Sequence, residues 1–326
     1  MIAATLLSAA LAAPACGQQI GAAGIGPSYQ FTNAPPTCEE AQVMAAMHAP
    51  VHKFRLAPPY GTTLLQFWQT DAATVCITSL PFQSLVFWAT PTLPSNVYGP
   101  NIANPAFYQQ NYNELYALAV WLRTAYVGTG RAFYIGNWET DNINGGIGVT
   151  PSQTSFQDEI GWFNIRQKAI NDAIAATPTS DVTVYHYVEV NAVQAAMSGS
   201  ARVINSVVPY LNPMPDFVSY SSYDSLYPNA STLLPPALAY IQKQIPLRPD
   251  GSSSVFLGEY GFKASYWGAQ GQATQSQKVL GIAQTAKLPL ALYWAVYDNT
   301  GYGYWLVDSN DVEQPVYFVL QSAVNP

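Results

Sequence analysis

The sequence is short of charge. Asp, Glu, Lys and Arg make up 10% of its 326 residues, against a usual share of about 25%. Its 12 Lys and Arg residues form no basic run that could neutralise phosphates, and the net charge is −7. We therefore expect no nucleic-acid partner.

Long apolar runs are also scarce. One apolar run opens the chain and ends in Ala13-Pro14-Ala15, a small-x-small pattern typical of signal-peptide cleavage. No other stretch has 18 uninterrupted apolar residues, so we expect no membrane span. The sequence predicts a signal peptide over 1–15 and a secreted chain over 16–326, either extracellular or periplasmic. The alternative is a disordered Ala-rich start, because the usual basic residue near Met1 is missing.

The chain has only three cysteines. Cleavage after Ala15 would leave Cys16 first, as in a bacterial lipoprotein, but the preceding residues match a lipobox poorly and simple secretion is preferred. Cys38 and Cys76 leave two interpretations open, namely one disulfide, as exported proteins often form, or two buried thiols. No CxxC motif or Cys/His cluster occurs, so no metal site is predicted.

Apolar, β-branched and aromatic runs recur along the chain and indicate strands. Seven such runs occupy 51–58, 84–91, 131–139, 182–190, 216–224, 254–262 and 290–298, and an eighth strand is expected within 17–31. Segments with helical periodicity lie between several of them, at 108–128, 155–177, 232–245 and 274–288. Near-continuous apolar runs are typical of parallel strands covered on both faces. The alternation predicts a single-domain (β/α)8 TIM barrel, and the absence of GxGxxG argues against a dinucleotide-binding open sheet.

Two carboxylates stand out against the apolar strands. Glu139 ends the fourth predicted strand, and Glu259 lies late in the seventh with a glycine on each side. The C-terminal ends of strands four and seven face each other across a barrel mouth, so the two acids can converge. A close carboxylate pair is the machinery of retaining glycoside hydrolysis, in which burial and repulsion let one member keep its proton. Few Lys and Arg residues are available to pair with them instead.

With these residues the chain resembles the clan A glycoside hydrolases and is similar in layout to family 5 cellulases and mannanases. The similarity runs from about residue 45 onward and includes a final helix opening near QPVYF (314–318). The resemblance implies that Glu139, in NWE, is the acid/base and that Glu259, in GEYG, is the nucleophile. It also implies that no metal or organic cofactor is needed.

The resemblance assigns further residues to the substrate site. Arg55 in FRLAP matches a basic residue late in strand two, and Arg55 and Tyr223 would hold Glu259 ionised and aimed. Tyr223 in SYSSYD matches an aromatic that hydrogen-bonds the nucleophile, with Tyr220 as the neighbouring choice. Trp294 in LYWAVYD matches a tryptophan that lines the floor of the cleaved-sugar site.

One departure concerns the fourth strand. The clan usually places Asn directly before the acid/base, whereas here Trp138 separates Asn137 from Glu139. We keep Asn137 as a substrate contact and Trp138 as a stacking platform for a sugar. Glu189, at the end of the fifth strand, is expected to support the site as a hydrogen-bond anchor for a sugar or for a neighbouring strand.

The sequence therefore predicts a secreted, monomeric, retaining β-glycoside hydrolase that cuts within a polysaccharide or oligosaccharide. Two alternatives stay open. The first is a carbohydrate-binding barrel without hydrolysis, which the displaced Asn137 favours. The second is a transglycosylase that uses the same two acids.

Overall fold

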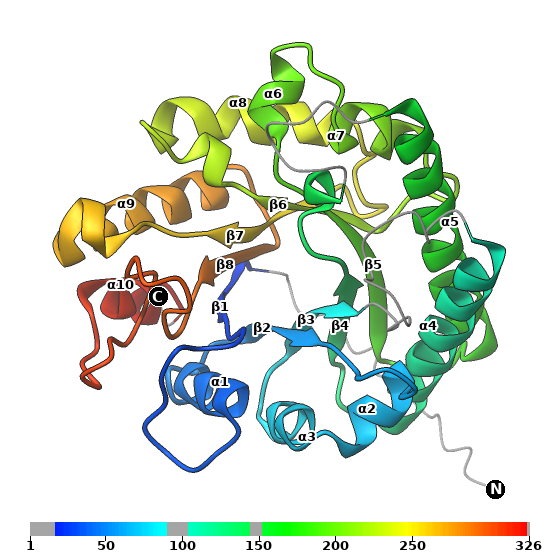
Figure 1. Cartoon of the computed structure of the whole chain (residues 1–326), viewed down its shortest axis with the longest axis horizontal. Helices are drawn as coiled ribbons and strands as arrows, with labels where there is room; N and C mark the ends of the chain where they lie inside the picture. The colour runs from blue at the N-terminus through cyan, green and yellow to red at the C-terminus, as the bar shows by residue number, and fades with distance from the viewer. Residues whose placement is uncertain (1–16, 90–103, 144–151, 325–326) are drawn as a thin grey trace, which may run out of the picture.

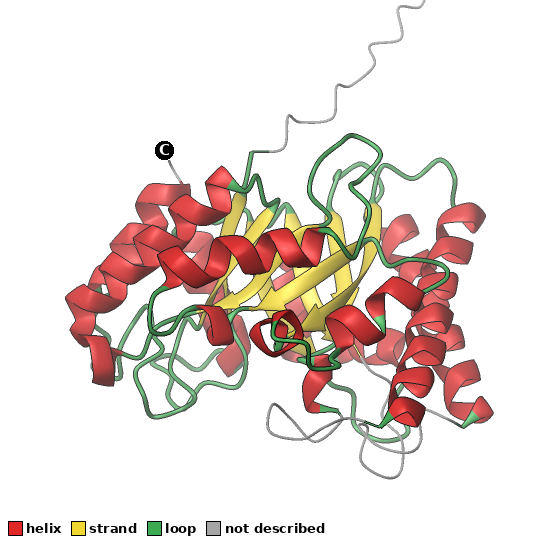
Figure 2. Ribbon diagram, turned by 90° about the horizontal axis from the view of Figure 1, so that it is seen from above, coloured by secondary structure: helices red, strands yellow, loops and turns green. Residues whose placement is uncertain are grey.

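The eight strands of the protein form a closed parallel barrel in chain order, β1 to β8. The computed structural model describes residues 17–89, 104–143 and 152–324, so the predicted signal peptide and Cys16 lie outside the described residues. Figure 1 shows the helices arranged around the central strands, and Figure 2 shows the same helices enclosing the barrel from a second direction. The predicted (β/α)8 TIM barrel is confirmed.

Each strand falls inside one of the predicted runs. The strands are β1 (Gln19–Ala23), β2 (Val51–Leu56), β3 (Ser84–Ala89), β4 (Ala132–Gly136), β5 (Thr183–Val190), β6 (Phe217–Ser221), β7 (Val255–Tyr260) and β8 (Leu290–Trp294). Most pair in continuous parallel register, but β7 is irregular against both of its neighbours.

The four predicted helices and the predicted final helix are present, and shorter ones accompany them. The helices are α1 (Pro36–Ala46), α2 (Leu64–Thr70), α3 (Ala72–Ser79), α4 (Pro105–Ala125), α5 (Gln153–Ala176), α6 (Val193–Met197), α7 (Val203–Ser206), α8 (Ala230–Gln242), α9 (Ala264–Thr285) and α10 (Pro315–Val324), with 3-10 turns η2 (Thr140–Asn142), η3 (Val208–Tyr210) and η4 (Tyr223–Ser225). None of those in the described part of the chain has the length and hydropathy of a bilayer-spanning segment.

Two apolar cores lie on the two faces of the strands, because successive side chains of a strand point to opposite sides. The larger core packs the outward-facing residues against the helices. The smaller core fills the barrel with Val51, Val86, Trp88, Tyr134, Tyr187, Phe217, Phe256, Leu290 and Leu292. Most of these precede the last residues of their strands, so the barrel is plugged toward its N-terminal end and open space remains at its C-terminal end.

The structure decides between the two interpretations of the cysteines. Cys38 in α1 and Cys76 in α3 form a disulfide with their Cα atoms 5.8 Å apart. The bond joins two helices of the outer layer, α1 before β2 and α3 before β3.

Candidate active site

Glu139 reaches the barrel mouth from the turn that follows β4. The strand ends at Gly136, and Glu139 immediately precedes η2. Its Oε1 accepts a hydrogen bond from Ser221 Oγ at 2.7 Å, and its Oε2 accepts from Asn142 Nδ2 at 2.5 Å and from Asn191 Nδ2 at 3.3 Å. The carboxylate is thus held by neutral donors from three different segments.

Glu259 reaches the same space because β7 is irregular. Phe256 belongs to the core inside the barrel, so strict alternation would turn Glu259 outward toward the helices. The pairing of β7 with β8 shifts register between Leu257 and Tyr260. The pairing of β6 with β7 shifts register between Tyr220 and Ser221 of β6. These irregularities bring the Glu259 carboxylate to the barrel mouth, where it is almost fully buried.

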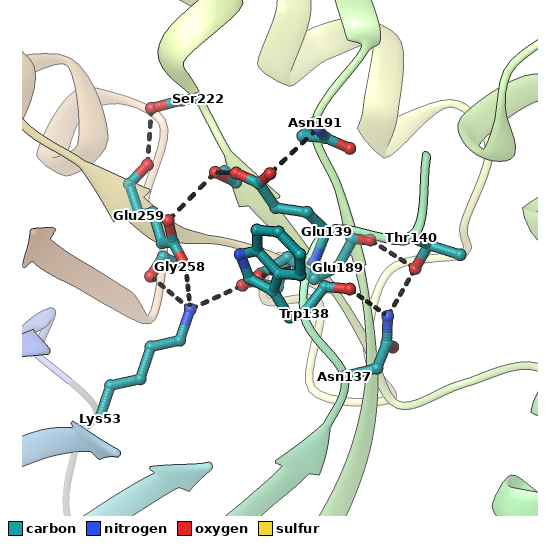
Figure 3. A network of polar contacts seen from close by, with 12 residues as sticks. Lys53, Asn137, Trp138, Glu139, Thr140, Glu189, Asn191, Ser222, Gly258 and Glu259 are labelled. Carbon is teal, nitrogen blue, oxygen red and sulfur yellow. Dashed lines mark hydrogen bonds and ion pairs between the residues drawn. The ribbon is translucent and has the colours of Figure 1, made fainter. Parts of the chain in front are cut away.

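A serine bridges the two acids. Ser221 Oγ lies 2.7 Å from Glu139 Oε1 and 3.4 Å from Glu259 Oε2. The two carboxylate oxygens are therefore separated by at most about 6 Å, the length of both contacts placed end to end. Figure 3 shows the two side chains facing each other, Glu139 from the turn after β4 and Glu259 from β7.

Lys53 of β2 is the cation that pairs with Glu259. Its buried Nζ donates to Glu259 Oε1 at 2.9 Å, to Glu189 Oε2 at 2.8 Å and to the carbonyl of Gly258 at 3.1 Å (Figure 3). The ammonium also lies 4.8 Å from the ring centroid of Trp88. It therefore bridges three strands, β2, β5 and β7.

This arrangement corrects the prediction that Arg55 holds the nucleophile. Arg55 follows Lys53 by two residues, so both side chains point to the same side of β2, but Arg55 lies nearer the strand end. It is exposed and lines the cavity, and its side chain donates no hydrogen bond to any described residue. In VHKFRL, Lys53 and Arg55 alternate with apolar residues and point to the same side of the strand. This pattern could have indicated that Lys53 lies deeper in the barrel than Arg55.

The two glycines beside Glu259 leave room for its neighbours. A Cβ on Gly258 would overlap Ser219 Oγ and lie 2.6 Å from Glu189 Oε2. A Cβ on Gly261 would lie 2.5 Å from the carbonyl oxygen of Trp294. The backbone at Gly258 therefore lies against Ser219 and Glu189, and the backbone at Gly261 lies against the end of β8. Both contacts are so close that only glycine fits at these two positions.

Neither Glu189 nor Asn137, both expected at the site, lines the cavity. Glu189 is fully buried; besides Lys53, it accepts hydrogen bonds from Ser219 Oγ at 2.8 Å and from the Glu139 backbone N–H at 3.2 Å. Asn137 is also fully buried and donates to Thr140 Oγ1 at 2.6 Å and to the Trp138 carbonyl at 3.1 Å. Glu189 thus anchors neighbouring strands, and Asn137 braces the turn after β4.

Tyr223 lines the cavity but makes a different contact from the one predicted. Its ring lies 5.9 Å from that of Tyr304. Within the described residues its hydroxyl makes no hydrogen bond to Glu259, and the donors to the Glu259 carboxylate are Lys53 and Ser221. Tyr220 is buried away from the acids and hydrogen-bonds to Asp224. Ser221, which was not predicted from the sequence, occupies the position between the acids.

Glu139 and Glu259 line a cavity of about 600 Å³, which is within the usual size range of small-ligand sites. Its lining comprises Arg55, Leu56, Ala57, Trp88, Trp138, Glu139, Tyr223, Glu259, Lys263, Trp294, Thr300, Tyr302 and Tyr304. The Trp88 ring centroid lies 6.1 Å from that of Trp138 and 6.2 Å from that of Trp294. Within the described ranges, no cluster of three or more His, Cys, Asp or Glu side chains has the arrangement of a metal site.

The electrostatics of the cluster favour one retained proton. Burial raises the pKa of Glu139. Burial also raises the pKa of Glu259 to about 8; the Lys53 ammonium opposes this shift, while repulsion from Glu189 and Glu139 adds to it. Because the two acids repel each other, their protons are lost in steps that belong to the pair. Of the two acids Glu139 and Glu259, only Glu259 contacts the Lys53 ammonium, which stabilises its ionised form. The proton that the two acids share is therefore more stable on Glu139.

No protein-family model and no curated protein matches the chain, but solved structures do. An exo-β-1,4-mannosidase from Opitutaceae bacterium strain TAV5 superposes with a TM-score of 0.63 at 13% identity, covering 94% of this chain and 59% of the mannosidase. A GH5-4 broad specificity endoglucanase from Bacteroides salanitronis gives 0.58 at 13% identity over 94% and 93% of the two chains. An endo-1,4-β-xylanase from Penicillium canescens gives 0.58 at 12% identity over 94% and 93%.

The chain shares the fold of these glycoside hydrolases. The fold implied by the resemblance to clan A is therefore confirmed. At such low identity the likeness concerns the fold alone, and the chain spans about three fifths of the mannosidase's length.

Proposed function

We propose that the protein is a secreted, retaining β-glycoside hydrolase that cuts within a polysaccharide or oligosaccharide. The observation that carries the proposal is the Glu139–Ser221–Glu259 bridge at an aromatic cavity, which limits the separation of the two acids to about 6 Å. Retaining enzymes place their two carboxyl groups about 5 to 5.5 Å apart, whereas inverting enzymes need about 6.5 to 9.5 Å to admit a water.

The contacts of the two acids suggest their roles. Glu259 is paired with Lys53, which favours the ionised form that a nucleophile needs, and it attacks the anomeric carbon. Glu139 carries the proton, gives it to the leaving oxygen and breaks the glycosidic bond. In the second step Glu139 takes a proton from water, the water oxygen attacks the anomeric carbon, and the bond from that carbon to Glu259 breaks so that Glu259 leaves as a carboxylate. Trp138 and Trp294 offer aromatic faces on which sugar rings can stack.

Hydrolysis of β-glucans, mannans, xylans and galactans is the first test. We expect shortened oligosaccharides from at least one of them, and proton NMR should show the β-anomer as the first product. An α-anomer formed first would contradict retention. Release of single sugars from one chain end would contradict cutting within the chain.

Removal of each acid tests the assignment of roles. Glu259→Ala and Glu139→Ala should each abolish turnover, and azide should restore activity on an aryl glycoside with opposite stereochemistry in the two variants. Rescue of Glu259→Ala should yield an α-glycosyl azide, because azide then replaces the nucleophile directly. Glu313→Ala is the matched control, since Glu313 is exposed and lies outside the cavity lining.

The same assays separate the alternatives. Glycan binding by calorimetry without any product would favour a non-hydrolytic barrel. Products longer than the starting oligosaccharide would favour transglycosylation.

A further inference from the structure

Two basic side chains line the cavity without taking part in the proposed chemistry. Arg55 lies at the end of β2, and Lys263 follows β7. In the closed barrel β8 and β1 lie between β7 and β2 (Figure 1). The segments that carry Lys263 and Arg55 therefore lie on either side of β8, which ends at Trp294. The chain has only 12 Lys and Arg residues, so their presence in one cavity needs a reason.

Neither cation has an acidic partner in the protein. All 19 Asp and Glu residues belong to the described ranges, because segments 1–16, 90–103, 144–151 and 325–326 contain none. Within those ranges the side chains of Arg55 and Lys263 form no ion pair and donate no hydrogen bond. The Lys263 ammonium lies 4.4 Å from the ring centroid of Tyr302, a contact that supplies no anionic acceptor.

The cations are also not required to balance the two acids of the site. Lys53 already contacts Glu259 at 2.9 Å, and Glu139 is held by neutral donors. A ligand that fills the cavity strips water from Arg55 and Lys263, which is unfavourable unless the ligand brings its own acceptors. Charged acceptors compensate best, and the planar guanidinium of Arg55 can bind two oxygens of one oxyanion at once.

We propose that the substrate of this site is an anionic glycan, whose carboxylate or sulfate groups are bound by Arg55 and Lys263 on sugars beside the cleaved bond. This proposal deepens the proposed hydrolase function and rests on it for the position of the glycan. Carboxylates of uronic acids and sulfate esters share the chemistry that the two cations recognise. The experiment must therefore include both sources.

The test compares matched substrates that differ only in charge. One pair is a β-linked glycan containing glucuronic acid and its carboxyl-reduced neutral form, and the other is a sulfated galactan and its desulfated form. For each pair, kcat/KM is measured for the unmodified protein, Arg55→Gln, Lys263→Gln and the control Lys243→Gln. Lys243 is an exposed lysine at the end of α8, outside the cavity.

We expect the unmodified protein to prefer the charged member of one pair, which identifies the anion. The charged-to-neutral ratio of kcat/KM should fall about 10-fold in Arg55→Gln and in Lys263→Gln, the loss expected for one charge-assisted hydrogen bond. Lys243→Gln should keep the ratio of the unmodified protein. An unchanged ratio in both cavity variants, or a preference for both neutral glycans, would overturn the proposal.

A binding measurement separates this proposal from the hydrolase function. Oligosaccharides from the charged glycans are titrated into the unmodified protein and both cavity variants at low and at high salt. Tight binding that weakens with salt and needs Arg55 or Lys263 supports the anionic site even if no glycan is cut, in which case the hydrolase function fails. Hydrolysis of neutral glycans at an unchanged ratio, without salt-sensitive binding, would leave the hydrolase function and remove the anionic site.

Discussion

The two ends of the barrel interior differ in chemistry although the same strands build both. Toward the N-terminal end the interior is filled with apolar and aromatic side chains such as Tyr134, Phe217 and Phe256. Toward the C-terminal end it holds a buried ammonium, Lys53, bonded to the carboxylates of Glu189 and Glu259. The interior changes from apolar to charged between two successive inward-facing residues of one strand. These residues are Val51 and Lys53 on β2, and Tyr187 and Glu189 on β5.

The two ends contribute differently to the stability of the fold. Each fully buried large apolar side chain stabilises the fold by about 1.5 to 3 kcal/mol. A buried ion pair must first overcome the desolvation of both charges, so it adds little or nothing to stability. The apolar end therefore stabilises the barrel, whereas the buried charges of the polar end contribute little to its stability.

The largest expected effect comes from breaking the polar end at its centre. Lys53→Met should lower kcat/KM about 1,000-fold, because Glu259 loses the charge that keeps it ionised. Removal of the ammonium raises the pKa of Glu259 further, so the acid limb of the pH–rate profile should move to higher pH. In the unmodified protein the alkaline limb should mark the loss of the pair's last proton, and burial of both acids moves this limb above the range of an ordinary carboxyl group.

Steady-state kinetics are measured between about pH 4 and 10 in steps of about half a pH unit. Lys243→Met, at an exposed position, controls for the loss of a lysine. An unshifted acid limb in Lys53→Met would show that Lys53 does not hold the charge of Glu259.

Truncation at the apolar end should affect stability instead. Phe256→Ala should reduce the free energy of unfolding by about 3 to 5 kcal/mol, because the ring is fully buried among the rings of Tyr134, Tyr187 and Phe217. Denaturant unfolding followed by circular dichroism measures this loss. Phe318→Ala should cost under about 0.5 kcal/mol, since Phe318 is 49% exposed. Equal losses in the two variants would contradict the assignment of Phe256 to the plug.

The disulfide lies in the outer helical layer, away from both ends of the barrel interior. Replacement of Cys38 and Cys76 by Ser should lower the free energy of unfolding by about 2 to 4 kcal/mol, because the bond closes a loop of 38 residues in the unfolded chain. Activity of the folded variant should stay near that of the unmodified protein, as neither cysteine lines the cavity. A large fall in kcat with unchanged stability would contradict this expectation.

The smallest expected effect comes from a substitution at Gly258, whose backbone lies against Ser219 and Glu189. Gly258→Ala should cost about 1 to 3 kcal/mol and lower kcat, since the new methyl displaces Ser219 and Glu189. Gly281→Ala in α9 is the matched control, because open space surrounds its Cβ position, and it should gain up to about 1 kcal/mol from helix propensity. Thermal unfolding and kinetics of both variants give the comparison. Identical kcat values would show that the cluster tolerates the methyl.

Much of the fold was accessible from local patterns. The strand runs and the helical periodicity place every strand and the long helices α4, α5, α8 and α9. The short helices α2 and α3 were missed because each is only about two turns long, although their caps, Thr63 and Asp71, are visible in the sequence. Glu139 and Glu259 could be selected because a carboxylate at the end of an apolar strand is rare in a chain so poor in charge.

The barrel, and the strand ends near which the two acids lie, could be predicted from local apolar periodicity and from the order of the strands along the chain. The tertiary structure alone decided that Lys53 rather than Arg55 pairs with Glu259, that Ser221 bridges the acids, and that Glu189 and Asn137 are covered. These outcomes depend on the depth of each side chain in the barrel and on the irregular register of β7. Depth and register arise from packing between strands far apart in the chain, and no local pattern records them.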